Sequence, residues 1–222
     1  MSEARLYSDT VPRDDRPSVI RHRLLLAGAG VCGLLLATGV AGLAGGFDPV
    51  PAEELPVVAA DEVFESEPWD VTVDGAALAA DLEPAVLYED GYWLAVVADV
   101  EITTDESWDR SFDEILYVTG VDGMAREHQE RSNYPGGIFA DDIRLVRDGT
   151  AVGALHPGLP ERLAFLWELA IDTPPPAEVH VEITGREYIE SNLNGQMEWL
   201  NEEPRAQLTL PVTDRREAGE EA

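Results

Sequence analysis

The stretch "YWLAVVADVEI", residues 92–102, decides the fold class. Its apolar side chains recur at every second position from Tyr92 to Ile102, and Asp99 and Glu101 stand between them. Successive side chains of a β-strand point to opposite faces, so a period of two is typical of a strand with one buried face. The stretch therefore predicts a strand that packs one face on a hydrophobic core.

Six further stretches have the alternation or the composition of short strands. Turn signals separate the predicted strands, with Asp-Gly at 90–91 and 148–149, Pro-Gly at 157–158 and Asn-Gly at 194–195. Such spacing favours two packed antiparallel sheets, so we predict an all-β fold, an antiparallel β-sandwich of seven or eight strands over residues 62–213. The stretches are "WDVTV" (69–73), "EILYVTGV" (114–121), "DIRLV" (142–146), "LAFLWELAI" (163–171), "EVHVEITG" (178–185) and "AQLTLPV" (206–212).

The order of these stretches resembles a known domain type. "YWLAVVADVEITTDES" (92–107) is followed by "ILYVTGVDG" (115–123), "LHPGLPERLAFLWELAI" (155–171) and "EVHVEI" (178–183). Together they resemble the immunoglobulin-like (telokin-like) extracytoplasmic domains of unknown function in single-pass membrane proteins of Gram-positive, in particular actinobacterial, bacteria. The resemblance covers about residues 67–213, and Thr-Thr-Asp at 103–105 replaces the usual Asn. It implies a location in the cell envelope and a binding or accessory role, and it supplies no catalytic residues.

A long apolar run precedes this region. No charged residue occurs in residues 24–47, and as a helix this run would span roughly 36 Å, enough to cross a hydrocarbon core of about 30 Å. Arg21 and Arg23 lie directly before the run, whereas the next Arg after it is Arg110. The positive-inside rule therefore predicts a cytoplasmic N-terminus and an extracytoplasmic C-terminal domain.

Two alternatives to a permanent anchor remain open. A signal peptidase could cleave after the small residues at 42–44, and a lipoprotein signal would place its lipid on Cys32. We favour an uncleaved signal-anchor because the run is longer than a typical signal peptide and 23 residues precede it. The expected division of the chain is a cytoplasmic tail (1–23), a transmembrane helix (24–46), a Pro-rich acidic linker (47–61), the sandwich (62–213) and a disordered acidic tail (214–222).

Small side chains recur at every fourth position of the predicted membrane helix. On a helix they form a slowly drifting stripe, and such stripes allow two transmembrane helices to approach closely. We therefore expect packing with a second copy of the helix or with a membrane partner, through Ala29, Gly33, Ala37, Ala41 and Gly45.

The composition excludes several classes of function. The chain has 44 acidic and 15 basic residues, all of them Arg, for a formal net charge of -29. Nucleic-acid binding requires cations that neutralise phosphates, so we expect no nucleic-acid partner. Cys32 is the single cysteine, which rules out an intrachain disulfide and a zinc site built on several Cys.

Catalytic motifs are missing from the sequence. It contains no G-x-S-x-G elbow, no H-E-x-x-H and no Gly-rich phosphate loop, and His128, His156 and His180 are expected at the surface. We therefore predict that the protein is not an enzyme and uses no cofactor. Acidic clusters are weak candidates for a Ca²⁺ site, although their spacing is not that of an EF-hand loop. The candidate ligands are Asp105, Glu106, Asp109, Asp113, Glu114, Asp141 and Asp142.

Two segments could form a contact surface. "REYIESNLNGQMEWLNEEP" (186–204) predicts a protruding hairpin with Tyr188, Met197 and Trp199, although Trp199 could instead pack on the sandwich edge. "RSNYPGGIF" (131–139) is a similar loop with Tyr134 and Phe139. Aromatic residues and Met are enriched in the cores of protein interfaces.

These observations favour one function class. We expect a membrane-anchored extracytoplasmic module that binds another envelope or membrane protein, for example in a transporter or an envelope-assembly complex, or that self-associates. The alternative is an envelope sensor or scavenger domain that binds a ligand or Ca²⁺.

Overall fold

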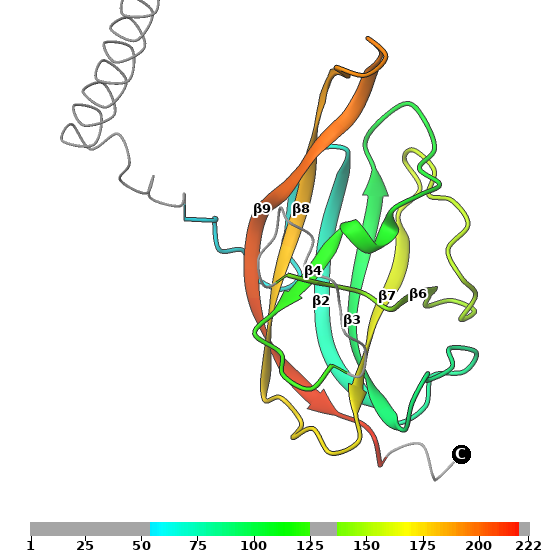
Figure 1. Cartoon of the computed structure of the whole chain (residues 1–222), viewed down its shortest axis with the longest axis vertical. Helices are drawn as coiled ribbons and strands as arrows, with labels where there is room; N and C mark the ends of the chain where they lie inside the picture. Colours follow the sequence, from blue (N-terminus) through cyan, green and yellow to red (C-terminus); the bar gives the residue numbers. More distant parts are fainter. Residues whose placement is uncertain (1–53, 125–136, 218–222) are drawn as a thin grey trace, which may run out of the picture. The chain divides into compact units, whose positions relative to one another are not determined.

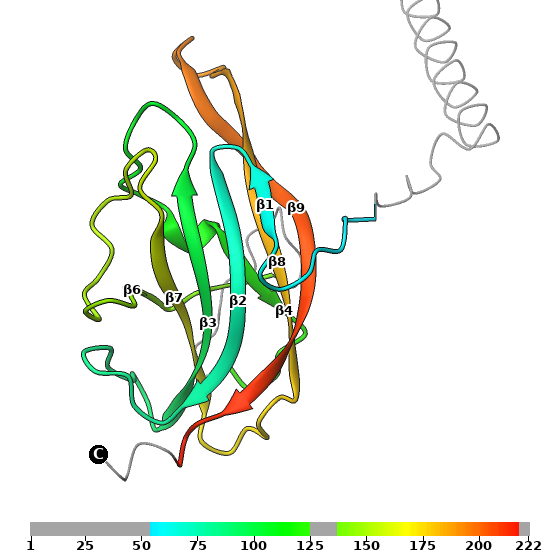
Figure 2. The same ribbon diagram turned by 180° about the vertical axis from the view of Figure 1, so that it is seen from behind.

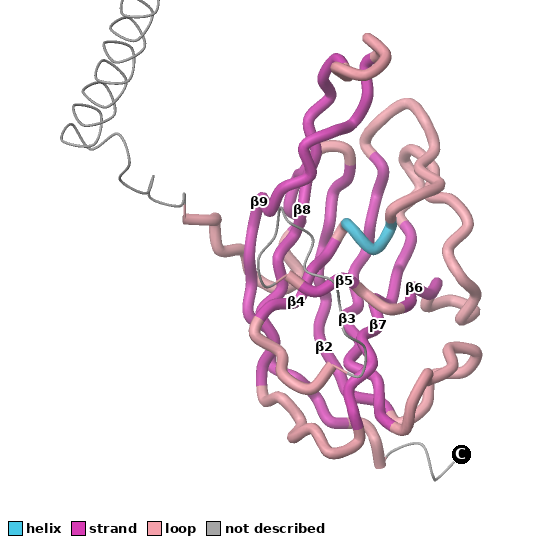
Figure 3. Tube along the Cα trace, in the orientation of Figure 1, coloured by secondary structure: helices cyan, strands magenta, loops and turns pink. Residues whose placement is uncertain are grey.

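The computed structural model describes residues 54–124 and 137–217, and this part of the chain is all-β (Figures 1 and 3). Its only helical element is the single 3₁₀ turn η1 (Phe112–Glu114). The strands are β1 (Val63–Ser66), β2 (Trp69–Ala79), β3 (Gly91–Ile102), β4 (Leu116–Thr119), β5 (Ile138–Phe139), β6 (Asp142–Leu145), β7 (Glu161–Ala170), β8 (Glu178–Glu190) and β9 (Met197–Asp214).

The strands form one strongly curled sheet with two facing halves. Their order is β5-β4-β8-β9-β2-β3-β7-β6, and β1 pairs with β2. All of these pairings are antiparallel except that of β2 with β9, where residues 76–78 pair in parallel with 212–214. The two views in Figures 1 and 2 show the β4-β8-β9 half lying opposite the β2-β3-β7 half. This short parallel contact is therefore the joint between the two layers.

One hydrophobic core fills the space between the layers. Every second residue of β3 from Tyr92 to Ile102 is at most 1% exposed, as the alternation predicts. Trp69, Phe165 and Trp167 are fully buried in the same cluster. Burial of one Val, Leu or Phe side chain contributes about 1.5–3 kcal/mol, so this core accounts for most of the stabilisation.

The outer face of β3 is also covered, at one end of the domain. Trp93 packs with Ala85 and Leu166 in a second, smaller cluster beneath the loop between β2 and β3. The fully buried Glu168 of β7 holds this loop, because its carboxylate accepts the backbone N–H groups of Tyr88 (2.9 Å) and Glu89 (2.7 Å).

All seven stretches predicted as strands lie in or overlap strands of the sheet, so the all-β class is confirmed. The pattern did not reveal β1 and β5, whereas the hairpin predicted over 186–204 is formed by the distal parts of β8 and β9. The ordered domain also begins before the predicted boundary at residue 62. Gln207 of β9 donates its backbone N–H to the Pro56 carbonyl and accepts the N–H of Val58, so part of the predicted linker lies along β9.

Several predictions fall outside the described residues. They are the cytoplasmic tail, the membrane helix with Ala29, Gly33, Ala37, Ala41 and Gly45, the first part of the linker, Tyr134, His128 and residues 218–222. Within residues 54–124 and 137–217, no helix has the length and apolar character needed to cross a membrane.

Candidate functional site

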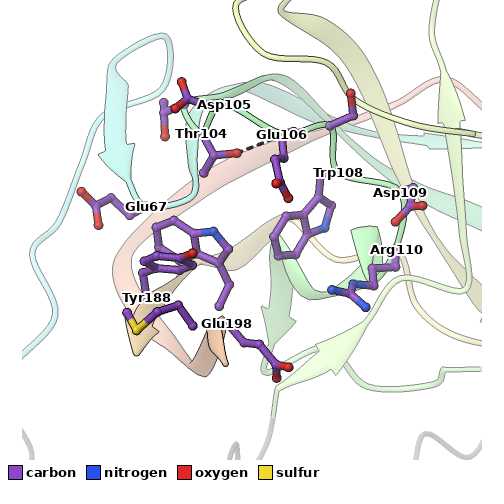
Figure 4. A pocket seen from close by; sticks show the side chains of 13 residues that line it. Glu67, Thr104, Asp105, Glu106, Trp108, Asp109, Arg110, Tyr188 and Glu198 are labelled. Carbon is purple, nitrogen blue, oxygen red and sulfur yellow. Dashed lines mark hydrogen bonds between the residues drawn. The ribbon is translucent and has the colours of Figure 1, made fainter. Parts of the chain in front are cut away.

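A pocket of about 510 Å³ (Figure 4) opens at the end of the domain where the β8–β9 hairpin projects in Figure 1. Three segments that are distant in sequence meet there: the turn between β1 and β2, the loop after β3, and the hairpin. The lining residues are Glu67, Thr103, Thr104, Asp105, Glu106, Ser107, Trp108, Asp109, Arg110, Tyr188, Met197, Glu198 and Trp199.

Three aromatic rings give the pocket its apolar surface. Trp108 is 8% exposed and packs edge-on against Trp69, with ring centroids 5.3 Å apart. Tyr188 and Trp199 face each other across the β8–β9 hairpin, and their ring centroids are 5.1 Å apart. Trp108 is held in place by its backbone, which exchanges two hydrogen bonds with Leu155 (2.9 and 2.8 Å). The β8–β9 pairing therefore holds Tyr188 and Trp199, and an isolated bridge to Leu155 holds Trp108 within the loop after β3.

Several carboxylates belong to the pocket wall, and Figure 4 shows the Glu106 side chain directed into the pocket, whereas those of Glu67 and Asp105 extend away from Tyr188. Glu67, Asp105, Glu106 and Asp109 are exposed, and none of them is in an ion pair within the described part of the chain. A fifth acid, Glu198, accepts a hydrogen bond from Asn194. The pocket wall thus carries five acidic groups and a single cation, Arg110.

A buried charged cluster centred on Arg186 lies beside the pocket. The Arg186 guanidinium pairs with the carboxylates of Glu114 and Glu202, in the second case at 3.2 Å between Nη2 and Oε2. The three side chains are only 13, 11 and 14% exposed. Arg186 also lies 5.5 Å from the Trp108 ring centroid and donates from Nη1 to the Trp199 carbonyl (3.3 Å). It therefore contacts two residues that line the pocket.

The protonation of this cluster is shifted by its surroundings. Burial, together with the positive charge of Arg110, lowers the pKa of Arg186. Burial, together with the negative charge of Asp113, raises the pKa of Glu202 to about 7. Since one guanidinium serves two carboxylates, a proton on Glu202 leaves the buried group close to neutral.

An irregularity in β8 places Arg186. The β8–β9 register shifts between Ile183 and Thr184 and again between Gly185 and Glu187. At this point β8 leaves β4 and approaches the turn before β2, so the Arg186 N–H bonds to the Glu67 carbonyl at 2.7 Å. Gly185 permits that approach, because a Cβ there would lie 3.1 Å from the Glu67 carbonyl oxygen and 2.8 Å from Cγ of Arg205.

The structure brings together three of the residues predicted for a contact surface, namely Tyr188, Met197 and Trp199. Phe139 lies elsewhere: it is 8% exposed and packs edge-on against Tyr117 at 4.5 Å, so it is part of the interior. Sequence reasoning did not single out Trp108, although a lone Trp in the acidic run "DESWDRSFDE" is a usable signal. No local pattern marks Arg186, whose partners come from other elements.

The acidic residues considered for Ca²⁺ are spread over separate places. Asp105, Glu106 and Asp109 line the pocket, whereas Asp113 and Glu114 lie on η1. Asp141 accepts the Glu168 N–H at 2.9 Å and Asp142 pairs with Arg144 at 2.5 Å. Among the described residues, no group of three or more His, Cys, Asp or Glu side chains is arranged to hold a metal ion.

The two described histidines are engaged in hydrogen bonds. His156 Nδ1 lies 2.8 Å from the Ser107 hydroxyl, and His180 Nδ1 lies 2.8 Å from the Thr209 hydroxyl.

A second hollow, of about 1100 Å³, lies at the opposite end of the sandwich. The loop between β2 and β3 lines it together with Ile171. Val86 and Tyr88 are 79 and 73% exposed there. This end offers matched positions for control variants.

Comparisons with known proteins give no family. No protein-family model and no curated protein sequence matches the chain. An uncharacterized β-sandwich protein from Clostridium difficile 630 aligns at 14% identity with a TM-score of 0.42, over 74% of this chain and 99% of its own. A candidate lipoprotein from Staphylococcus aureus subsp. aureus NCTC 8325 aligns at 8% identity with a TM-score of 0.36, over 72% and 99% of the two chains. The all-β class therefore rests on the strands and the core of this chain itself.

Proposed function

We propose that this chain is a membrane-anchored extracytoplasmic module that binds another envelope or membrane protein through the pocket end of its domain. The observation that carries the proposal is the meeting of Tyr188, Met197 and Trp199 of the β8–β9 hairpin with Trp108 in one pocket. Trp, Tyr and Met are enriched at the centres of protein interfaces, where they fill pockets on the partner or receive its side chains.

The hairpin beside the pocket presents further apolar surface. Leu193 at its tip is 98% exposed, and Tyr188 and Met197 are about half exposed, at 53 and 49%. The tip is closed by backbone hydrogen bonds, from Ser191 N–H to the Gln196 carbonyl (2.7 Å) and from Gly195 N–H to the Ser191 carbonyl (2.9 Å). Exposed apolar groups gathered in one place favour an interaction site over a freely solvated surface.

The sequence supports the remaining parts of the proposal. The domain is an immunoglobulin-like sandwich held by the signal-anchor at 24–46, with the N-terminus in the cytoplasm, because Arg21 and Arg23 precede the apolar run. The partner is then a protein of the same membrane or envelope, such as a transporter or an envelope-assembly complex. The stripe of small residues in the anchor would add a contact with the partner's helix within the bilayer.

Position-specific photo-crosslinking in cells tests this function. A photoreactive residue placed at Leu193 of the full-length chain should yield one dominant crosslinked species. The same residue at Val86, which is 79% exposed at the other end of the domain, should not yield it. The substitution Trp199→Ala should abolish the Leu193 crosslink. Equal products from Leu193 and Val86, or a Leu193 product that persists in W199A, would overturn the proposal.

A further inference from the structure

We propose that the pocket receives a positively charged side chain, Arg or Lys, from an extended segment of the partner protein. The inference deepens the proposed function and rests on it, because it specifies the chemistry of the partner at the same site. It depends on three features of the pocket: its rings, its unpaired carboxylates and the charge beside it.

The rings supply a surface that attracts cations. Trp and Tyr faces carry negative electrostatic potential and bind guanidinium and ammonium groups within about 6 Å of the ring centroid. The protein already uses Trp108 in this way, since Arg186 lies 5.5 Å from its centroid. Tyr188 is 53% exposed and packs against Trp199 with a 40° angle between the ring planes, so this pair presents the accessible aromatic surface of the pocket.

The carboxylates make that surface selective for positive charge. Glu67, Asp105 and Glu106 come from the two loops that line the pocket together with the hairpin, and Figure 4 shows Glu106 directed into it. None of the three is in an ion pair within the described residues. A guest guanidinium or ammonium would find charge-assisted acceptors there, whereas an anionic guest would be repelled.

The neighbouring buried cluster does not oppose a cationic guest. Arg186 could in principle repel it, but two carboxylates, Glu114 and Glu202, offset its charge. Among the residues that line the pocket, Arg110 is the single cation, and it is exposed. The whole chain has a net charge of -29, so long-range attraction also draws a basic segment toward the domain.

The size of the pocket suits a side chain together with its neighbours. Its volume of about 510 Å³ lies within the range of about 300–1,000 Å³ of pockets that bury small ligands. A single Arg or Lys side chain would leave space, which the flanking backbone of an extended segment would fill. Apolar neighbours of that segment would contact Met197 and Leu193 along the hairpin.

Tryptophan NMR can test this inference on the full-length chain. The protein has five Trp residues, and only Trp108 and Trp199 line the pocket, so labelled indole N–H groups report on it separately. The chain, held in a non-ionic maltoside detergent, would be titrated with three end-blocked peptides, Ala-Gly-Arg-Gly-Ala and its analogues with central Lys or Gln. Single Trp→Phe variants assign the five signals.

The Arg and Lys peptides should shift the Trp199 and Trp108 signals and leave those of Trp93 and Trp167 in place. Their affinity should be at least about threefold higher than that of the Gln peptide, and should fall when NaCl is raised. The variant Asp105→Asn/Glu106→Gln should lower the affinity for the Arg peptide. The charge-matched control Asp81→Asn/Glu89→Gln at the other end should leave that affinity unchanged.

The inference would be overturned if all three peptides gave equal shifts or no shifts. It would also be overturned if both double variants lost affinity for the Arg peptide equally. Its failure is distinguishable from failure of the proposed function. If the peptides fail while the Leu193 crosslink still depends on Trp199, the module binds a protein through other chemistry. If the crosslink itself fails, the proposed function fails, whatever the peptides do.

Discussion

Arg186 is shared by two carboxylates, Glu114 and Glu202, in a place where all three side chains are largely shielded from water. Such groups contribute little net stability when complete, but removal of one partner leaves a buried charge without compensation. Burial, together with the negative charge of Asp113, raises the pKa of Glu202 to about 7. The native state keeps a proton on Glu202 at a pH where the unfolded chain has released it.

This proton makes stability depend on pH in a defined direction. The pKa of Glu202 is higher in the folded state than its ordinary value of 4.5, so its stabilising contribution is complete below pH 4.5 and is lost as the pH rises to 7. The variant Glu202→Gln should therefore match the wild type near pH 4.5 and exceed its free energy of unfolding at pH 8, by at most about 3 kcal/mol. Urea unfolding of the full-length chain at both pH values measures this.

The matched control for this prediction is Glu203→Gln, which removes an exposed neighbour on the same strand. This control should leave the difference in free energy of unfolding between pH 4.5 and pH 8 the same as in the wild type. A Glu202→Gln variant whose stability stays parallel to that of the wild type across this range would contradict the assignment.

At the scale of single residues, the sequence revealed about half of the site. Tyr188, Met197 and Trp199 stand out because large apolar side chains among polar ones around an Asn-Gly turn have a clear reason to be at a surface. Arg186 and Glu202 could not be identified in this way. Their importance comes from burial beside Glu114, which lies on η1, and no local pattern encodes that proximity.

Among the elements, β8 has the most specific requirement, at its irregularity near Gly185. The variant Gly185→Ala should destabilise the domain by about 1–3 kcal/mol, because the added methyl group would overlap the buried Ser66 hydroxyl and lie 3.1 Å from the Glu67 carbonyl oxygen. Gly75→Ala in β2 is the matched control, since nothing lies within 4 Å of its added Cβ. Chemical denaturation of both variants measures the difference. Equal effects of the two substitutions would contradict the close approach.

The elements also show where sequence patterns succeed and where they fail. β3 and β7 were predictable because one face of each strand packs on the core and imposes an apolar period of two. The distal arms of β8 and β9 have no fully buried face and show no such period, so only the Asn-Gly turn at 194–195 indicated their hairpin. β1 and β5, with four and two residues, are too short to show any period.

For the whole molecule, the dominant property is its charge of -29. Repulsion among so many carboxylates opposes the compact state. At 0.1 M ionic strength, salt largely screens the repulsion between exposed charges that are more than about 10 Å apart. Raising NaCl from 20 to 300 mM should therefore raise the melting temperature, by about 3 °C or more. Differential scanning fluorimetry of the full-length chain measures this.

Calcium chloride at matched ionic strength completes the experiment. A rise in melting temperature equal to that with NaCl indicates general screening. A much larger rise in melting temperature at low millimolar Ca²⁺ would support specific Ca²⁺ binding. A melting temperature that falls or does not change with NaCl would contradict a fold limited by charge repulsion.

The parallel contact between β2 and β9 has a consequence for the order in which the domain forms. β9 pairs with β8, with β2 at 212–214 and, through Gln207, with the segment around Pro56 and Val58. The strand that joins the two layers is thus the last of the described strands to be synthesised. Earlier strands can pair locally as they emerge, but the layers close on each other only once β9 has arrived. Folding is therefore completed at the end of synthesis rather than progressively, and until then the inner faces of β2 and β3 remain open to any chaperone that binds the chain.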